Sequence, residues 1–244
     1  MRGLDTLKQY VMKECPQYAQ NVEYRTIRDQ RVAGNLGAVI KGQPKAFIDA
    51  IKMLDSWKYK DDSGDIDLGR PSEWGPDCIL VIDSLSRLCD AAYDWQDALT
   101  PAGRSGEKDG RAVYGNAQDA IENLLSMLTG PAMETNVIVI AHGLYMDLPD
   151  GTSKIFPQGV GQKLSPKIPQ YFPNVIRYKN ASGKRTIQLK SDAMVDLANA
   201  APFAMPDSLA VEDGLAKFFA VLRDPPKQET AKPPKPQSIT LKRA

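Results

Sequence analysis

The sequence predicts an α/β fold in which a mostly parallel sheet is covered by helices on both sides. Two short runs are apolar apart from Asn136, CILVI at 78–82 and NVIVIA at 136–141. Strands that are apolar on both faces belong to parallel sheets buried between helices. Apolar residues recur at helical spacing in the chain between the two runs. Strand, helix, helix and strand in that order require a crossover connection, which makes the two strands parallel.

Two helices are expected between these strands. The first begins at Leu85, from which apolar residues recur every three or four positions as far as Ala92. The second lies within residues 112–130, and its predicted core-facing side chains are Tyr114, Ala117, Ile121, Leu124 and Leu128. The gap between the helices is rich in glycine and charge, and its basic residues Arg104, Lys108 and Arg111 are expected to be plain surface.

The residues before the first apolar run are expected to hold four elements. A leucine and valine face near Met1 indicates that the chain starts inside or just before a helix. The stretch NVEYRTI at 21–27 is a strand candidate. Residues 42–57 predict a helix with Pro44 in its first turn. Residues 60–77 are rich in Gly, Asp and Pro, which is typical of a surface loop.

The chain changes character after His142. Residues 143–167 are rich in Gly and Pro and weakly periodic, which predicts a long loop. Two alternating stretches, 172–179 and 184–190, are joined by NASG and predict a β-hairpin that extends the sheet.

A last helix is expected at 211–222, packed against this hairpin. The final stretch, 224–244, is rich in Pro and Lys and is expected to be a disordered tail that follows one core at 1–223.

Composition limits the class of protein. The 31 Lys and Arg residues against 30 Asp and Glu leave a net charge of +1, which argues against a surface that coats nucleic acid but permits a local basic patch. Cys15, Cys78 and Cys89 are an odd number without close spacing, so core thiols of a reducing compartment are expected. One histidine and no CxxC make a structural zinc site improbable. The apolar runs are too short to cross a bilayer, and a soluble cytoplasmic protein is expected.

Polar residues end both apolar runs. Asp83 and Ser84 follow the first, and His142 follows the second. Ligands of open α/β sheets gather at the carboxyl ends of the strands, where a carboxylate and a hydroxyl can hold magnesium and a histidine can touch a phosphate. The alternative is that Asp83 and Ser84 only cap the helix from Leu85, and that His142 is structural.

Several segments together resemble RecA-like P-loop ATPases: CILVIDSLS, YGNAQDAIENLLSML and NVIVIAH, followed by KLSPKIPQYFPNVIRY and DGLAKFFAVL. The resemblance is strongest to phage nucleotide-binding proteins related to single-strand-annealing recombinases, and it covers most of 2–223. It implies a three-layer RecA-like sandwich, ATP and Mg²⁺ as ligands, and a phage-infected bacterial cell as the location. Asp83 would be the Walker B carboxylate and His142 the phosphate sensor.

A phosphate loop of the form G-x-x-x-x-G-K-S/T does not occur in these residues. SGKRT from Ser182 lacks the leading glycine and lies between two strands, and GVGQK from Gly159 fails on spacing. In RecA-like proteins the loop precedes a segment that RGLDTLKQYV resembles, so the chain is expected to lack its first βαβ unit. A truncated reading frame and a protein that has lost catalysis both explain this, and an in-frame upstream search would separate them.

The resemblance also implies partners. In RecA-like proteins the loop after the sensor contacts DNA, and here that loop offers Tyr145 and Phe156 for stacking on bases, with phosphate contacts expected from Lys154, Lys163 and Lys167. A homo-oligomer is expected in which Arg185, beside Lys184, completes the site of a neighbour. Partners would be single-stranded DNA and a phage replication or recombination protein.

Three alternatives stay open at this stage. The lysines after His142 could be incidental, and Lys184 and Arg185 could simply flank the NASG turn. The whole chain could be a non-catalytic nucleic-acid-binding or scaffold module. A different α/β enzyme that uses Asp83 and His142 as an acid and base is disfavoured, because no G-x-S-x-G or G-x-G-x-x-G motif accompanies them.

Overall fold

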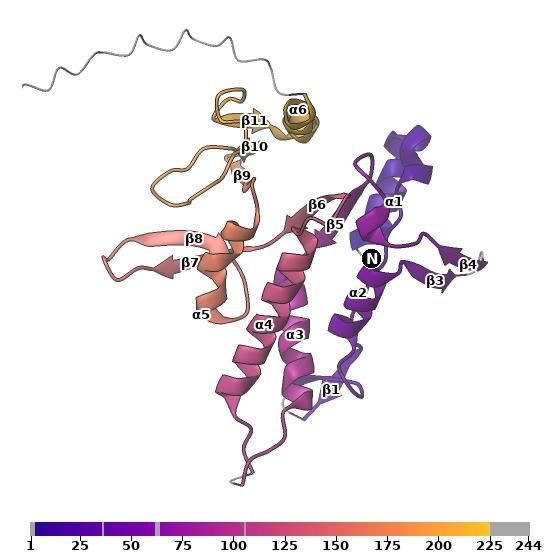
Figure 1. Cartoon of the computed structure of the whole chain (residues 1–244), viewed down its shortest axis with the longest axis vertical. Coiled ribbons are helices and arrows are strands. Elements are labelled where there is room, and N and C mark those ends of the chain that lie inside the picture. Colours follow the sequence, from indigo (N-terminus) through magenta and orange to yellow (C-terminus); the bar gives the residue numbers. More distant parts are fainter. Residues whose placement is uncertain (1–2, 36, 62–63, 105, 225–244) are drawn as a thin grey trace, which may run out of the picture. The chain divides into compact units, whose positions relative to one another are not determined.

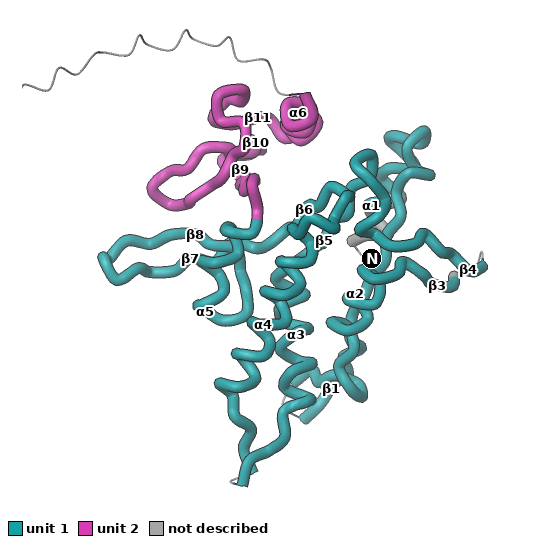
Figure 2. Tube along the Cα trace, in the orientation of Figure 1, with its two compact units in different colours: residues 1–171 teal, residues 172–244 magenta. Residues whose placement is uncertain are grey.

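A computed structural model describes residues 3–35, 37–61, 64–104 and 106–224. The chain divides into two compact units, unit 1 through Tyr171 and unit 2 from Phe172 onward (Figures 1 and 2). The predicted tail lies outside the described residues from position 225 onward. Among the described residues, no helix is both long and apolar enough to cross a membrane.

Unit 1 begins with helical and hairpin elements. They are α1 (Gly3–Glu14), the 3₁₀ helix η1 (Pro16–Asn21), the hairpin of β1 (Arg31–Gly34) and β2 (Gly37–Ile40), α2 (Ala46–Asp55), the hairpin of β3 (Lys58–Asp61) and β4 (Gly64–Asp67), and η2 (Pro71–Glu73). The helix predicted at the chain start is confirmed. The surface loop predicted at 60–77 is wrong in part, because it contains β4 and the end of β3.

The strand predicted at 21–27 is also wrong, since residues 22–30 form no helix or strand. Asp29, two residues after the predicted strand, contacts the start of α2. Its carboxylate accepts the backbone N–H groups of Lys45 at 2.7 Å and Ala46 at 3.2 Å. The carboxylate therefore caps α2 from a distant part of the sequence. Helix α2 accordingly begins after Pro44 and does not include it.

The centre of unit 1 is a strand, helix, helix, strand arrangement, as predicted. It consists of β5 (Ile79–Asp83), α3 (Leu85–Leu99), α4 (Gly110–Leu128) and β6 (Asn136–Ile140). Strands β5 and β6 pair in parallel with Asp83 opposite Ile140. Helices α3 and α4 pack against each other, and Asp109 caps α4 by accepting the N–H groups of Arg111 and Ala112.

The core of this centre comes from one face of each helix. Its fully buried apolar side chains are Leu80 of β5, Leu85, Cys89 and Ala92 of α3, and Val113, Ala117, Ile121, Leu124, Leu125 and Leu128 of α4. Tyr114 is an error of the prediction, because it is 47% exposed. Its ring lies against Tyr93, with ring centroids 4.7 Å apart. Cys78, expected as a core thiol, is exposed, and all three cysteines are free.

The predicted single sheet does not form among the described residues. Their strands make five small sheets, of which only β5–β6 is parallel. One face of that pair is open, since Ile79, Val81 and Ile140 are each 44–49% exposed. The fold prediction is therefore confirmed only as a mixed α/β fold with a parallel pair of strands at the centre of unit 1.

Unit 1 ends with a third hairpin and two short helices. They are β7 (Gly143–Asp147), β8 (Ser153–Pro157), α5 (Gly161–Leu164) and η3 (Ser165–Tyr171). The long loop predicted after His142 is therefore wrong over β7 and β8. Exposed and half-buried residues alternate along β7, as in a strand with one covered face.

Unit 2 contains β9 (Arg177–Ala181), β10 (Lys184–Gln188), β11 (Ser208–Ala210) and α6 (Val211–Arg223). The predicted hairpin is confirmed, and Ser182 and Gly183 turn it with φ angles of 51° and 80°, as a two-residue hairpin turn requires. The expectation that the hairpin extends the β5–β6 sheet is wrong, because among the described residues the hairpin belongs to a separate three-stranded sheet in the order β11-β10-β9. Helix α6 is confirmed, and its Phe218 packs with Ile187 and Leu189 in a separate core.

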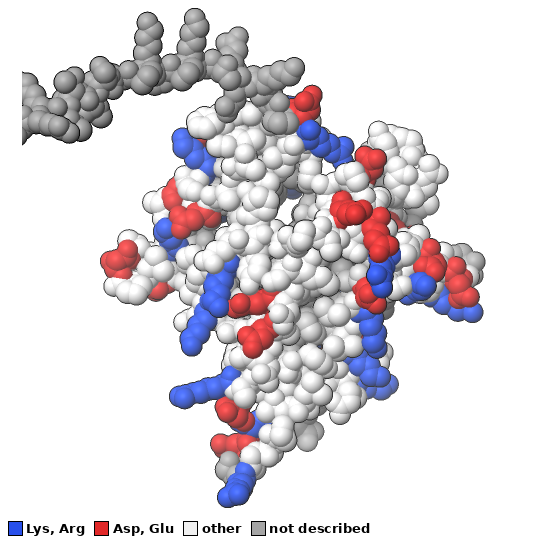
Figure 3. All heavy atoms as spheres, viewed as in Figure 1, with Lys and Arg blue, Asp and Glu red and all other residues white. Residues whose placement is uncertain are grey.

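Charges of both signs lie interspersed over the face in Figure 3, as the near balance of the composition predicts.

Candidate nucleotide site

Asp83 and His142 lie at one edge of the parallel pair. Asp83 is the last residue of β5, and its partner Ile140 ends β6 two residues before His142. Both side chains are exposed. Because parallel strands end at the same edge of their sheet, the two predicted residues are brought together as the sequence order required.

Ser84 caps the helix that starts at this edge. Its hydroxyl accepts the N–H of Arg87 at 3.4 Å, and the residue is buried to 7% exposure. The peptide bond between Asp83 and Ser84 is cis. The capping role that was the alternative for Ser84 is thus observed, while its role as a metal ligand stays a prediction.

Ser86 is a residue of this edge that the prediction missed. Its side chain is 3% exposed and joins three elements. The hydroxyl accepts the backbone N–H of His142 at 3.0 Å and donates to the carbonyl of Gln158 at 3.4 Å. The N–H of Gln158 in turn donates to the carbonyl of His142 at 2.8 Å.

The Ser86 network fixes His142 and both ends of the β7–β8 hairpin to the first turn of α3. A signal for it exists in the sequence, because Ser86 precedes the buried Cys89 by three residues on one helical face. A buried hydroxyl needs partners.

The side chains at the edge of β5 and β6 are suited to a magnesium ion that takes most of its ligands from phosphate and water. The described residues contain no group of three or more His, Cys, Asp or Glu side chains that could hold a metal by themselves. Asp83 supplies a single exposed carboxylate instead. Magnesium keeps several waters and is commonly bound through one or two carboxylates plus substrate phosphates, so one carboxylate beside a phosphate fits this ion and an all-protein metal cage does not.

The residues predicted to contact DNA fall on the β7–β8 hairpin and on the helices after it. Tyr145 is opposite Ile155, and Phe156 is opposite Leu144. Cross-strand partners share a face while successive residues alternate, so Tyr145 and Phe156 point to opposite faces of the hairpin. Tyr145 is 65% exposed and Phe156 is half-buried. A single strand of bases cannot stack on both rings from one side.

The three predicted lysines have different surroundings. Lys154 is half-buried, on the same hairpin face as Phe156. Lys163 is exposed on α5. Lys167 forms an ion pair of 2.8 Å with Glu122 of α4, and this hydrogen bond and charge raise the pKa of Lys167. Lys163 is therefore the better placed cation for a phosphate.

Arg185 lies in unit 2, on β10, with an exposed side chain next to Lys184. It is opposite Asn180 of β9. Its predicted role in the site of a neighbouring copy stays a prediction.

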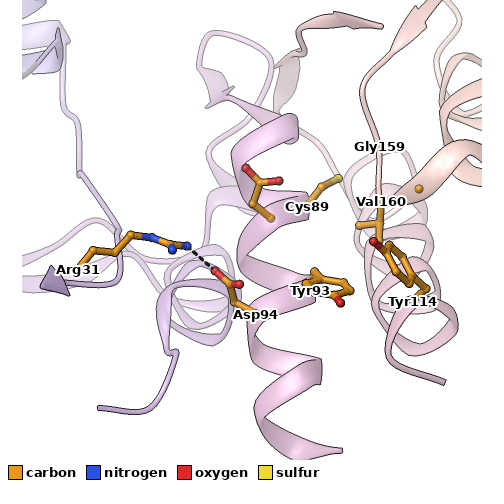
Figure 4. Close-up of a pocket in the computed structure, with 9 residues that line it drawn as sticks. Arg31, Cys89, Tyr93, Asp94, Tyr114, Gly159 and Val160 are labelled. Carbon is orange, nitrogen blue, oxygen red and sulfur yellow. Dashed lines mark hydrogen bonds and ion pairs between the residues drawn. The ribbon is translucent and has the colours of Figure 1, made fainter. Parts of the chain in front are cut away.

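A hollow of about 290 Å³ lies alongside α3 in unit 1 (Figure 4). Its lining includes Asp94, paired with Arg31 at 2.7 Å, together with Cys89 and Tyr93. Burial raises the pKa of the Cys89 thiol to about 12, and the charge of Asp90 adds to the shift. Burial also raises the pKa of Asp94, and Arg31 opposes that rise. None of the predicted site residues lines this hollow.

Comparison with known proteins gives one match. A family model described as an AAA domain matches residues 28–197, more than two thirds of the chain. The match covers Asp83, Ser84 and His142, and it extends into unit 2 as far as Leu197. No curated protein and no solved structure matches the chain.

Proposed function

This chain belongs to the AAA domain family of P-loop ATPases, and from that premise we propose that it is a RecA-like nucleotide-binding ATPase of phage type. In this proposal it acts on single-stranded DNA in recombination or replication. Membership of the family supports nucleotide binding, usually with Mg²⁺. The finer parts of the proposal rest on the resemblance of the segments around β5, β6, η3 and α6.

The observation that carries the proposal is the edge shared by Asp83 and His142. In the proposed site, Asp83 would hold the magnesium ion of Mg·ATP and His142 would contact the γ-phosphate. Magnesium would supply charge neutralisation between the phosphate oxygens. The chain's part is to keep the carboxylate and the imidazole at fixed positions, which the parallel pairing and the Ser86 network support.

The proposed DNA contacts lie on the β7–β8 hairpin, whose two ends are held by the Ser86 network, and on the helices that follow it. Loss of the γ-phosphate contact at His142 would move the ends of the β7–β8 hairpin, because His142 and Gln158 are bonded to each other and to Ser86. Tyr145 and Lys163 are the proposed contacts to bases and phosphates, with Lys154, Phe156 and Lys167 as further candidates. The exposed side chains of Tyr145 and Lys163 support the first two.

The test compares two forms of the protein. The 244 residues contain no G-x-x-x-x-G-K-S/T motif, so we expect the chain alone to show no ATP hydrolysis above background. In a longer form that carries the loop, sought by translating the reading frame upstream, Asp83→Ala should abolish magnesium-dependent hydrolysis. Turnover by the 244-residue chain that Asp83→Ala removes would contradict the need for a separate phosphate loop.

The proposed homo-oligomer has its own test in the longer form. Arg185→Ala should lower hydrolysis on the order of a thousandfold, the scale of a lost arginine finger, with nucleotide affinity nearly unchanged. Mixing this variant with an Asp83→Ala variant should restore part of the activity, because one kind of mixed interface holds an intact site. A silent Arg185→Ala together with no restoration on mixing would remove Arg185 from the site.

A second candidate is a non-catalytic nucleic-acid-binding or scaffold module with the same fold. The 244 residues contain no phosphate-loop motif, and this candidate applies if the reading frame upstream has none either. An in-frame stop codon upstream, with no such motif before Met1, would decide for the module. A motif within about forty codons, the length of one βαβ unit, would decide for the ATPase.

A further inference from the structure

Helix α6 packs on β10 and β11 at one face of the unit 2 sheet, and we name the opposite face the open face. Helix α6 covers the face that carries Ile187 and Leu209, and a Cβ at Gly214 of this helix would lie 3.0 Å from each of these side chains. Cross-strand partners share a face, so the register assigns the other face. Its members are Arg177, Lys179 and Ala181 of β9, Lys184, Thr186 and Gln188 of β10, and Ser208 and Ala210 of β11.

This open face, defined by those eight residues, is polar and basic. It carries three cations, Arg177, Lys179 and Lys184, and no carboxylate. Apart from two alanines, its remaining members are hydroxyl and amide residues. Lys184 and Ser208 are exposed, while Arg177, Lys179, Thr186 and Gln188 are half-buried. The side-chain oxygen of Gln188 is buried, so the accessible part of the face lies toward the turn at Ser182 and Gly183. Residues i and i+2 of a strand are about 7 Å apart, so Arg177 and Lys179 form a short row.

Only one carboxylate compensates these cations within the described residues. Asp192 lies 3.8 Å from Lys179 and accepts a hydrogen bond from Gln188 at 3.0 Å. The bond from Gln188 and backbone N–H groups lower the pKa of Asp192. Other lysines of unit 2 are paired more closely, Lys190 with Asp207 at 3.2 Å and Lys217 with Asp213 at 2.6 Å. In the part of the chain that the structure describes, Arg177 and Lys184 form no ion pair.

We propose that the open face of the unit 2 sheet binds the phosphate backbone of a single-stranded nucleic acid. Cations bind phosphate by charge, and hydroxyl and amide groups such as Thr186 and Ser208 donate further hydrogen bonds to phosphate oxygens. The three strands span about 10 Å, which suits one backbone. A membrane surface fits less well, because the face has no large apolar side chain to insert.

This surface goes beyond the proposed function, which places its DNA contacts on unit 1. It depends on the proposed function only for the identity of the partner, and it requires neither ATP nor a phosphate loop. Arg185 is not part of it, because Arg185 shares the opposite face with Tyr178 and Ile187.

The experiment measures binding of the 244-residue chain to fluorescein-labelled (dT)20 by anisotropy from 50 to 200 mM NaCl. The variant Arg177→Gln/Lys179→Gln/Lys184→Gln should flatten the slope of log K against log[salt] by about 2, since each phosphate contact on a single strand contributes about 0.7. At 0.1 M salt the same relation gives an affinity about 100-fold lower. Asp192→Asn should act in the opposite direction and tighten binding several-fold.

The control removes the same charge elsewhere. Lys52→Gln/Lys190→Gln/Lys217→Gln replaces three lysines that each have a carboxylate within 4 Å and lie off the open face, and its affinity should stay within about threefold of the parent chain. Circular dichroism checks that both triple variants are folded. If the first is not, Lys184→Gln alone, next to the turn, should still flatten the slope by about 0.7.

Three results would overturn the inference. If the open-face variant matches the control while Lys154→Gln/Lys163→Gln loses binding, DNA contacts are confined to unit 1, and the proposed function survives without this surface. If the parent chain does not bind (dT)20 at 50 mM NaCl, the inference and the DNA part of the proposed function both fail. If polyglutamate competes as well as (dT)20 at equal charge, the partner is an acidic peptide instead.

Discussion

Replacing Ser86 by alanine removes the buried hydroxyl that ties the first turn of α3 to His142 and to Gln158. The 3.0 Å bond from the His142 N–H is the stronger of its two contacts, and the 3.4 Å contact to the Gln158 carbonyl is the weaker. A buried polar group that loses its partner costs about 1–3 kcal/mol. We assign this whole range of destabilisation to the unpaired N–H of His142, and we expect the unpaired carbonyl of Gln158 to add little to it.

The expected result is a lower melting temperature. A loss of about 1–3 kcal/mol at roughly 2–4 °C per kcal/mol for a chain of this size gives a decrease of about 2–12 °C. Differential scanning calorimetry measures it directly. Hydrogen exchange followed by NMR should also show faster exchange of the His142 amide, because the amide loses its hydrogen-bond acceptor.

Ser126→Ala is the matched control. The Ser126 hydroxyl donates only to the carbonyl of Glu122 within its own helix, and the residue is exposed. Alanine has the higher helix propensity, so this change should leave stability within about 0.5 kcal/mol or raise it slightly. Equal melting temperatures for the two variants, or unchanged protection of the His142 amide in Ser86→Ala, would refute the role assigned to Ser86.

Three further predictions concern other parts of the chain. At pH 8 a thiol with a pKa of about 12 is only about one part in 10⁴ thiolate. Iodoacetamide should therefore modify the exposed Cys78 and leave Cys89 unmodified until the protein unfolds, as measured by mass spectrometry. Rapid labelling of Cys89 in the folded protein would contradict its burial. Ser182 has a positive φ of 51°, so Ser182→Asn should stabilise the unit 2 hairpin by up to about 1 kcal/mol in thermal unfolding, whereas Gly183→Ala at φ 80° should destabilise it by a similar amount. Burial raises the pKa of Asp94 in the folded state, so Asp94 contributes stability at low pH that is lost as the pH rises through that pKa. Arg31→Gln removes the cation that opposes the rise, so the variant should lose this stability at a higher pH. An unchanged titration of Asp94 in the variant, followed by ¹³C NMR, would show that the ion pair is not formed.

The parallel pair and the position of Asp83 and His142 at its edge were predictable because their signals are local. Five consecutive apolar residues followed by Asp83 predict a strand that ends in a carboxylate, and the helical repeats after it require the crossover. The burial of both faces that such a run also predicts is wrong, because Ile79 and Val81 are exposed. The turn at Ser182 and Gly183 was predictable for the same reason, since a two-residue turn selects residues that tolerate a positive φ.

The failures involve partners that are distant in sequence. Residues 21–27 have the composition of a strand, but Asp29 two residues later is used to cap α2, and nothing near Asp29 announces that contact. Tyr114 has helical spacing that points to the core, yet it lies at the rim of the hollow beside α3. The β7–β8 hairpin was hidden by its glycines and prolines, which are typical of loops but here occupy strand ends and the turn.

Helix α3 links the edge at Asp83, the Ser86 network and the hollow of unit 1. Its first residue follows Asp83 and Ser84, its second is the Ser86 that holds His142 and Gln158, and its next turns line the hollow through Cys89 and Asp94. A packed helix moves as a rigid element, because its buried side chains have no free volume into which to shift separately. Leu85, Cys89 and Ala92 are each at most 2% exposed, so α3 meets this condition over its first two turns. We therefore expect a ligand that shifts Ser84 to shift Ser86 with it, and with Ser86 its hydrogen bonds to His142 and Gln158 at the two ends of the hairpin.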